Sequence, residues 1–322
     1  MNQNDWSRSL KYPCRYHHRI LGITIILVLS LAVSGCALDG TKFASGFFHT
    51  ITPSPTNSPV PTSTSTIAPT STPTATDTPT PTATSSPTMT PTSTFAYHPA
   101  GKVCIPILLY HHVVPMEAPN RYSISAANFA VQMAAFKNLG YTTVSVEQLV
   151  RAVEIGDTLP QNPLVITFDD GYEDVYQNAY PALKNKGFTA TILLVSTYVG
   201  TETFMTQAEV LDLIKAGWEV GSHSRTHLDL TKNYPRLQEE IVQSRADLMQ
   251  LTGQDIRIFA YPYGAVDPTV FKKVVEAGYT MGLGLGNSIL HDLNTVYYLD
   301  RIEVRSDTEL TSLIQAITCP EE

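Results

Sequence analysis

The sequence has no excess of positive charge. It contains 21 lysine and arginine residues against 29 aspartate and glutamate residues, which gives a formal net charge of −8. A chain with this balance has no positive field that would attract nucleic acid or an anionic polymer over a distance. The composition therefore argues against a nucleic-acid partner and favours a neutral or cationic polymer.

The chain also lacks an apolar run of membrane-spanning length. Its longest run covers residues 20–33 and follows a polar segment with four basic residues, Arg8, Lys11, Arg15 and Arg19. A membrane span needs about 20 apolar residues, whereas a basic segment followed by a shorter apolar one is typical of a signal peptide. We therefore expect the remainder of the chain to be exported.

The apolar run ends in Ser34, Gly35 and Cys36, which resembles the lipobox of bacterial lipoproteins. This resemblance implies that residues 1–35 are a lipoprotein signal peptide and that Cys36 becomes the lipidated N-terminus. The alternative is an uncleaved signal anchor in which Cys36 has no role. Either alternative places the rest of the chain outside the cytoplasm, and the first predicts a lipid-anchored protein that faces the cell exterior or envelope.

Large apolar and charged residues are scarce in the next part of the chain. After a short mature N-terminus at residues 36–49, residues 50–95 are dominated by Thr, Pro and Ser, with Asp77 as the only charged residue. Such a segment cannot bury a core, and its prolines favour extended polyproline II. We predict a disordered linker whose composition also permits O-glycosylation.

Cysteine is rare, with four residues in the whole chain. Cys14 and Cys36 flank the apolar run, whereas Cys104 and Cys319 lie near the two ends of the globular region. In an oxidising compartment Cys104 and Cys319 could form a disulfide, the alternative being two unrelated thiols.

Residues 103–319 alternate between short apolar runs and amphipathic segments, which predicts one catalytic domain with an α/β fold. The expected strands are residues 105–110, 164–168, 189–195, 218–221, 258–260 and 279–283. The expected helices are residues 126–139, 174–186, 206–216, 234–251 and 308–317. This alternation indicates parallel strands in an α/β barrel or a doubly wound sheet, and in both folds reactive groups gather at the carboxyl ends of the strands.

Two adjacent carboxylates, Asp169 and Asp170, follow the expected strand at residues 164–168. Their mutual repulsion would raise a pKa unless a cation lies beside them, so the pair indicates one metal ligand and one base. The alternative for an isolated Asp-Asp-Gly is a turn with helix-capping carboxylates.

Two histidines, His223 and His227, follow the strand at residues 218–221. Residues four apart lie on one face of a helical turn, a spacing that can hold one ion. With Asp170 they would supply one oxygen and two nitrogens, a set that suits Zn²⁺ and leaves a coordination position open for catalysis. Asp169 would then be the base that takes a proton from water.

These motifs resemble those of the polysaccharide deacetylases of the NodB-homology family. Thr-Phe-Asp-Asp-Gly at residues 167–171, His-x-x-x-His at residues 223–227 and Tyr-Pro-Tyr-Gly at residues 261–264 match three family motifs in order. The resemblance implies a distorted (β/α) barrel, a metal held by Asp170 and the two histidines, and Asp169 as base. It also implies that the Tyr263 backbone N–H stabilises an oxyanion, although residues 261–264 alone would suggest only a turn.

Residues 107–113, Ile-Leu-Leu-Tyr-His-His-Val, resemble the subgroup that deacetylates poly-N-acetylglucosamine. This likeness implies that His111 is the general acid; packing beneath the barrel mouth is the alternative for His111, and His291 is a second candidate acid.

The chain departs from the family pattern at Ala260, where many members have an arginine that orients the base, and no Asp-x-x-x-Trp segment follows Tyr279. The orienting group therefore stays open. Arg257 is near but out of register, and Arg301 and Arg305 are remote candidates.

The sequence thus predicts a metal-dependent hydrolase that removes N-acetyl groups from a polysaccharide containing N-acetylglucosamine. Poly-N-acetylglucosamine, peptidoglycan and chitin-like polymers remain open as substrates. Two alternatives are an O-acetyl esterase acting on xylan, which would use the same metal chemistry, and a catalytically silent glycan-binding module on a tether.

Overall fold

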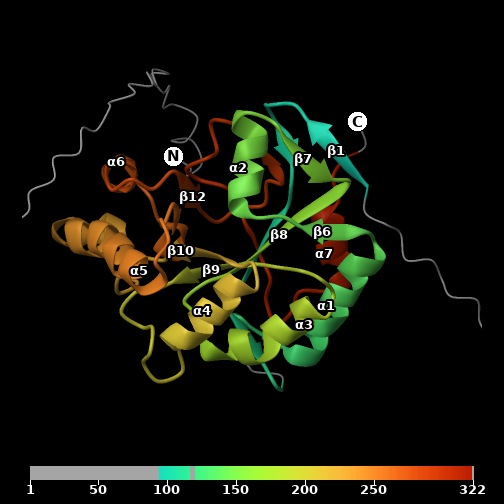
Figure 1. The fold of residues 1–322 in the computed structure, drawn as a ribbon, viewed down its shortest axis with the longest axis horizontal. Coiled ribbons are helices and arrows are strands. Elements are labelled where there is room, and N and C mark those ends of the chain that lie inside the picture. The colour runs from blue at the N-terminus through green and yellow to red at the C-terminus, as the bar shows by residue number, and fades with distance from the viewer. Residues whose placement is uncertain (1–93, 117–119, 321–322) are drawn as a thin grey trace, which may run out of the picture. The chain divides into compact units, whose positions relative to one another are not determined.

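The computed structural model describes residues 94–116 and 120–320 (Figure 1). The predicted signal peptide, Cys36, the mature N-terminus at residues 36–49 and the linker up to residue 93 lie outside these ranges. Within the described part of the chain, no helix is both long enough and apolar enough to cross a membrane.

A curled parallel sheet forms the centre of the domain. Its main path runs in the order β12-β11-β10-β9-β8-β3-β14, and β6 pairs with β8 beside this path. Every strand pair in this sheet is parallel. The strands are β3 (Ile107–Tyr110), β6 (Tyr141–Thr143), β8 (Asn162–Phe168), β9 (Thr191–Leu194), β10 (Glu219–Ser222), β11 (Ile258–Ala260), β12 (Met281–Leu283) and β14 (Ile302–Glu303).

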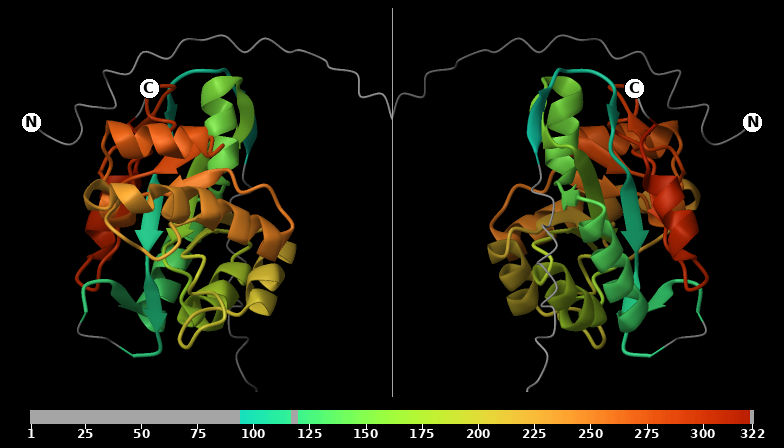
Figure 2. Two further views of the ribbon diagram at one scale, coloured as in Figure 1. Left: turned by 90° about the vertical axis from the view of Figure 1, so that its left-hand side faces the viewer. Right: turned by 90° about the vertical axis from the view of Figure 1, so that its right-hand side faces the viewer.

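Helices surround this sheet, as Figures 1 and 2 show. They are α1 (Ala126–Asn138), α2 (Val146–Glu154), α3 (Tyr180–Lys184), α4 (Gln207–Lys215), α5 (Ser244–Thr252), α6 (Pro268–Glu276) and α7 (Leu310–Ile317). The arrangement is a distorted (β/α) barrel, which confirms the predicted fold class. A capping box begins α4, since Thr206 and Glu209 exchange side-chain to backbone hydrogen bonds.

Alternate residues of the strands pack into two separate hydrophobic clusters. Ile166 and Ile192 belong to the cluster that contains the buried side chains of α1, α4 and α5. Val165 and Leu193, their neighbours in sequence, belong to the cluster that contains the buried side chains of α2. The strands are therefore buried on both faces, which explains why they appear in the sequence as continuous apolar runs rather than alternating ones.

Two predicted helices are less regular than expected. The segment 174–186 is a π-helical turn at Val175–Ala179 followed by the short α3, and segment 234–251 is a 3-10 turn at Tyr234–Arg236, a π-helical segment at Gln238–Gln243 and then α5. Pro181 in α3 has no N–H to donate, so a regular hydrogen-bond ladder cannot pass through it. Helices α2 and α6 were not predicted from the sequence, although Ser145 and Asp267 cap them with side-chain hydrogen bonds.

Among the residues that the structure describes, three short strand pairs lie outside the main sheet. The antiparallel pair β1 (Phe95–His98) with β7 (Asp157–Pro160) extends the folded unit N-terminal to the predicted boundary at residue 103. β2 (Val103–Cys104) pairs with β13 (Leu290–His291), and β4 (His112–Val114) pairs with β5 (Ser123–Ser125).

Cys104 and Cys319 form a disulfide with their Cα atoms 6.0 Å apart. It joins the short strand β2 to the segment that follows α7, so it ties together the two ends of the predicted catalytic domain.

Candidate active site

A cavity of about 320 Å³ opens at the carboxyl ends of the parallel strands. Residues that directly follow four strands of the sheet line it: His111 after β3, Asp169 after β8, His223 after β10 and Tyr261 after β11. The parallel strands bring these side chains together because their carboxyl ends meet on one side of the sheet. The cavity thus contains all three motifs predicted from the sequence.

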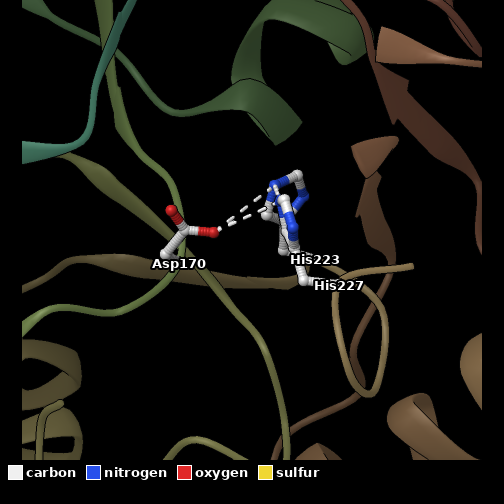
Figure 3. A group of neighbouring side chains, drawn as sticks. All are labelled: Asp170, His223 and His227. Carbon is white, nitrogen blue, oxygen red and sulfur yellow. Dashed lines mark hydrogen bonds and ion pairs between the residues drawn. The ribbon is translucent and has the colours of Figure 1, made fainter. Parts of the chain in front are cut away.

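Asp170, His223 and His227 converge in this cavity. Their ligand atoms lie within 4.8 Å of one another. Asp170 Oδ1 is 3.8 Å from Nε2 of His223 and 3.5 Å from Nε2 of His227, and the two Nε2 atoms are 3.2 Å apart. Figure 3 shows both imidazole rings on the same side of the Asp170 carboxylate.

The surroundings of His223 leave its Nε2 atom available for a metal ion. Its Nδ1 lies 2.9 Å from the carbonyl oxygen of Ala260, so Nδ1 carries the hydrogen and donates it. A metal-binding histidine commonly donates its other ring N–H to a backbone carbonyl in this way. Burial lowers the pKa of His223 to about 4, which keeps the ring neutral at physiological pH. One carboxylate and two neutral imidazoles fit Zn²⁺ or a neighbouring first-row metal.

The two histidines are not on a helical turn, so that expectation was wrong. They lie in a loop after β10 in which Ser224 and His227 have positive φ angles of 66° and 58°. The Ser224 hydroxyl accepts a hydrogen bond from the His227 N–H at 2.9 Å. The buried Glu240 carboxylate accepts hydrogen bonds from the N–H groups of Arg225 and Thr226 at 3.1 and 2.8 Å. Contacts to a distant helical segment, rather than local periodicity, therefore bring the histidines together.

Asp170 is in an environment that favours a neighbouring cation. Its side chain is buried, and its backbone has a positive φ of 72°. Burial, and next the charge of Asp169, raise the pKa of Asp170 to about 7. A positive ion between Asp170 and the histidines would relieve this unfavourable interaction and stabilise the carboxylate.

Asp169 has a different partner, the buried Arg301. Arg301 donates two parallel hydrogen bonds to Asp169, from Nη1 to Oδ1 at 2.7 Å and from Nη2 to Oδ2 at 2.9 Å. Burial disfavours the charge on Asp169, but the Arg301 guanidinium and His223 outweigh it and hold the pKa of this carboxyl below its usual range. Asp169 is therefore an ionised carboxylate in a fixed orientation.

Arg301 was one of three arginines left open by the sequence. It precedes β14, and its Nε donates to the carbonyl of Gly284 at 2.9 Å. The other two candidates form ion pairs elsewhere, Arg257 with Glu147 and Arg305 with Glu303. Of the three, Arg301 is the one that contacts Asp169.

His111 lines the cavity, and its ring packs against that of Tyr122 with a centroid distance of 5.0 Å. Its Nδ1 is buried and has no hydrogen-bond partner among the described residues. Burial lowers the pKa of His111, while the charge of Asp169 acts in the opposite direction.

His291, the second candidate acid, is not part of this site. It lies in β13, is 1% exposed, and its Nε2 is 3.1 Å from the carbonyl oxygen of Ile105. It does not line the cavity, so it was wrongly considered as an acid.

Tyr263 lies at the rim of the cavity with a positive φ of 61°. The residue is 62% exposed, and its ring meets the ring of His227 edge-on with the centroids 4.7 Å apart. The next residue, Gly264, also has a positive φ of 64°, and a Cβ there would lie 2.8 Å from the Leu285 side chain. Tyr263 therefore lies at the cavity beside His227.

Comparison with known proteins agrees with this geometry. Residues 156–282 match the sequence family described as polysaccharide deacetylase. The Bacillus subtilis (strain 168) protein YxkH is 28% identical over 201 residues, which cover 62% of this chain and 71% of that protein. The poly-beta-1,6-N-acetyl-D-glucosamine N-deacetylase of Staphylococcus aureus (strain MRSA252) is 25% identical over 201 residues, covering 58% of this chain and 69% of that protein.

A solved structure shares the fold. The Streptococcus pyogenes deacetylase PplD, in complex with acetate, superimposes with a TM-score of 0.62 and 24% sequence identity, over 69% of this chain and 100% of that one. The chain is thus similar in sequence to polysaccharide deacetylases over residues 156–282, and it shares the fold of PplD.

Proposed function

We propose that this protein is a metal-dependent hydrolase that removes N-acetyl groups from a glycan containing N-acetylglucosamine and releases acetate. One observation carries the proposal: a single cavity contains two neighbouring carboxylates with different partners. Asp170 faces His223 and His227, whereas Asp169 is held by Arg301. The similarity to the poly-beta-1,6-N-acetyl-D-glucosamine N-deacetylase of Staphylococcus aureus supports an N-acetylated glucosamine polymer as the substrate class.

Asp170, His223 and His227 would hold the divalent ion. When bound, Zn²⁺ or a similar ion would supply Lewis-acid chemistry at the acetamide carbonyl. The donor set fits such an ion because Asp170 Oδ1 and the Nε2 atoms of both histidines face one another. The Ala260 carbonyl fixes the His223 ring in the required orientation.

Asp169 would accept the proton of the attacking water. Its orientation is fixed by two hydrogen bonds from Arg301, so no rearrangement of the carboxylate is needed during the reaction. The Tyr263 backbone N–H would donate a hydrogen bond to the negative charge that develops on the acetyl oxygen. His111, which lines the same cavity, would give a proton to the departing amine as the carbon–nitrogen bond breaks.

The experiment that tests the substrate class compares acetate release from several acetylated polymers. We expect the zinc-loaded protein to release acetate from chitooligosaccharide, poly-β-1,6-N-acetylglucosamine or peptidoglycan faster than from acetylated xylan. Faster release from acetylated xylan would instead identify an O-acetyl esterase. If none of these polymers yields acetate while the protein holds its metal ion, a glycan-binding module is the correct interpretation.

We also propose that the protein is exported and anchored to the membrane by lipid on Cys36. The disulfide between Cys104 and Cys319 supports export, because disulfides persist in oxidising compartments. Metabolic labelling with a fatty acid is expected to mark the wild type but not Cys36→Ser. Equal labelling of both proteins would remove Cys36 as the lipid attachment site.

A further inference from the structure

His112 lines the cavity and forms a polar pair with Asp174, and neither residue has a role assigned above. Nδ1 of His112 lies 2.6 Å from Oδ2 of Asp174, and Oδ1 of Asp174 accepts a hydrogen bond from the Val113 N–H at 3.1 Å. The side chains of His112 and Asp174 are 23% and 22% exposed. The carboxylate therefore accepts a hydrogen bond from Nδ1–H, and Nε2 is left as the ring nitrogen that can reach a ligand.

Tyr172 fixes the plane of the same imidazole. The rings of His112 and Tyr172 are stacked, with centroids 3.6 Å apart and an interplanar angle of 27°. Tyr172 is in turn stacked on Phe204 at 4.8 Å. His112 is thus held on one edge by Asp174 and on one face by Tyr172, which makes it a pre-organised hydrogen-bonding group.

The remaining ring nitrogen of His112 has no assigned task in the protein. In residues 94–116 and 120–320, Nε2 of His112 has no hydrogen-bond partner. His112 lines the cavity together with Asp170 and Tyr172, and its ring is stacked on that of Tyr172. A substrate whose acetamide lies at Asp170 would therefore bring its sugar ring near His112.

We propose that His112 is a substrate-binding residue that shares a hydrogen bond, through Nε2, with a ring hydroxyl of the sugar that carries the acetamide. Asp174 is the positioning residue that orients His112. This inference rests on the proposed deacetylase function and adds a contact to the sugar itself. It predicts that the site distinguishes an acetylated sugar from an acetyl compound without a sugar ring.

The variant His112→Phe tests this contact, because phenylalanine keeps an aromatic face for Tyr172 and removes both ring nitrogens. We expect kcat/KM for chitooligosaccharide to fall about tenfold more than kcat/KM for p-nitrophenyl acetate, since one hydrogen bond contributes about that factor. The loss on the oligosaccharide should come mainly from a higher KM. Zinc content, measured on the same samples, should equal that of the wild type.

Two further variants separate a binding role from a structural one. Asp174→Asn should also lower kcat/KM for chitooligosaccharide more than kcat/KM for p-nitrophenyl acetate. The double variant should lose no more of its kcat/KM for chitooligosaccharide than His112→Phe alone, because Asp174 acts through His112. His98→Phe is the matched control. His98 lies in β1 and does not line the cavity, so kcat and KM of this variant should equal those of the wild type.

The outcomes distinguish this inference from the function on which it rests. If the wild type releases acetate from chitooligosaccharide and His112→Phe lowers kcat/KM equally for both substrates, or leaves both values unchanged, the sugar contact is wrong while the deacetylase assignment stands. If the zinc-loaded wild type releases no acetate from any oligosaccharide, both are overturned.

Discussion

Arg301 and Asp169 form a buried, two-point ion pair although 132 residues separate them in the sequence. The side chains of Arg301 and Asp169 are 1% and 3% exposed. Because this pair connects the segment before β14 to the end of β8, it couples the last strand of the barrel to the candidate base. Its removal should therefore affect both the stability of the protein and its activity.

The variant Arg301→Met should destabilise the protein by about 3–5 kcal/mol near neutral pH, because it leaves a buried carboxylate without its partner. The pKa of Asp169 is depressed in the folded protein, so the stabilising contribution of its charge is present above the unfolded value of about 3.9 and is lost as pH falls through the folded value. The difference in the free energy of unfolding between Arg301→Met and the wild type should therefore become smaller at acidic pH.

Chemical unfolding at several pH values measures this effect. Arg257→Met is the control, because its ion pair with Glu147 is partly exposed, and its loss should cost less than about 1 kcal/mol. Equal destabilisation by the two substitutions at neutral pH would contradict the role given to Arg301.

Metal affinity should depend on pH through Asp170. The pKa of Asp170 is raised to about 7 in the absence of a metal ion, and a ligand must lose its proton before it binds the metal. Below this value the apparent affinity for Zn²⁺ should fall by about tenfold per pH unit, and above it the affinity should level off. Calorimetric titration across this range measures the slope, and an affinity independent of pH would count against Asp170 as a ligand.

Glu240 should control metal affinity without touching the metal ligands. Its carboxylate holds two backbone N–H groups between His223 and His227, so Glu240→Ala should weaken Zn²⁺ binding by about 10- to 100-fold. Glu240→Gln keeps one acceptor oxygen, so its Zn²⁺ affinity should fall less than that of Glu240→Ala. Glu239→Gln is the control, since Glu239 binds Arg225 and Arg236 through their side chains. Unchanged Zn²⁺ affinity in a folded Glu240→Ala protein would refute this role.

The disulfide between Cys104 and Cys319 should stabilise the domain, since it closes a long loop. Removal of such a bond typically costs about 2–5 kcal/mol. We expect Cys104→Ser, Cys319→Ser and the double variant to show the same lowered Tm, because each removes the same bond. A calorimetric scan in which the double variant melted well below both single variants would show that each cysteine also contributes in another way.

The sequence was most informative where chemistry follows an apolar strand. Asp169, Asp170 and His223 could be placed at one side of a parallel sheet because the strands predicted at residues 164–168 and 218–221, which correspond to β8 and β10, end shortly before them. The α/β class followed from the same alternation of strands and helices, whereas the choice of a barrel over a doubly wound sheet came from the family resemblance. These features are local in sequence, so pattern and spacing are sufficient to predict them.

Other features depend on tertiary contacts that have no local signal. The orienting role of Arg301 could not be separated from that of Arg305, because only the folded sheet shows which of them reaches Asp169. The loop that joins His223 and His227 was expected to be helical, whereas hydrogen bonds to Glu240 hold it with two positive φ angles. The contact between His112 and Asp174 likewise joins two different elements.

The central claim is that Asp170, His223 and His227 hold the metal ion while Asp169 performs the proton transfer. Acetate release from chitooligosaccharide and zinc content, measured together on the wild type, Asp169→Asn and His223→Ala, test it most directly. The account predicts that Asp169→Asn keeps its zinc and releases almost no acetate, and that His223→Ala loses both. Wild-type acetate release by Asp169→Asn, or full zinc content and activity in His223→Ala, would contradict it.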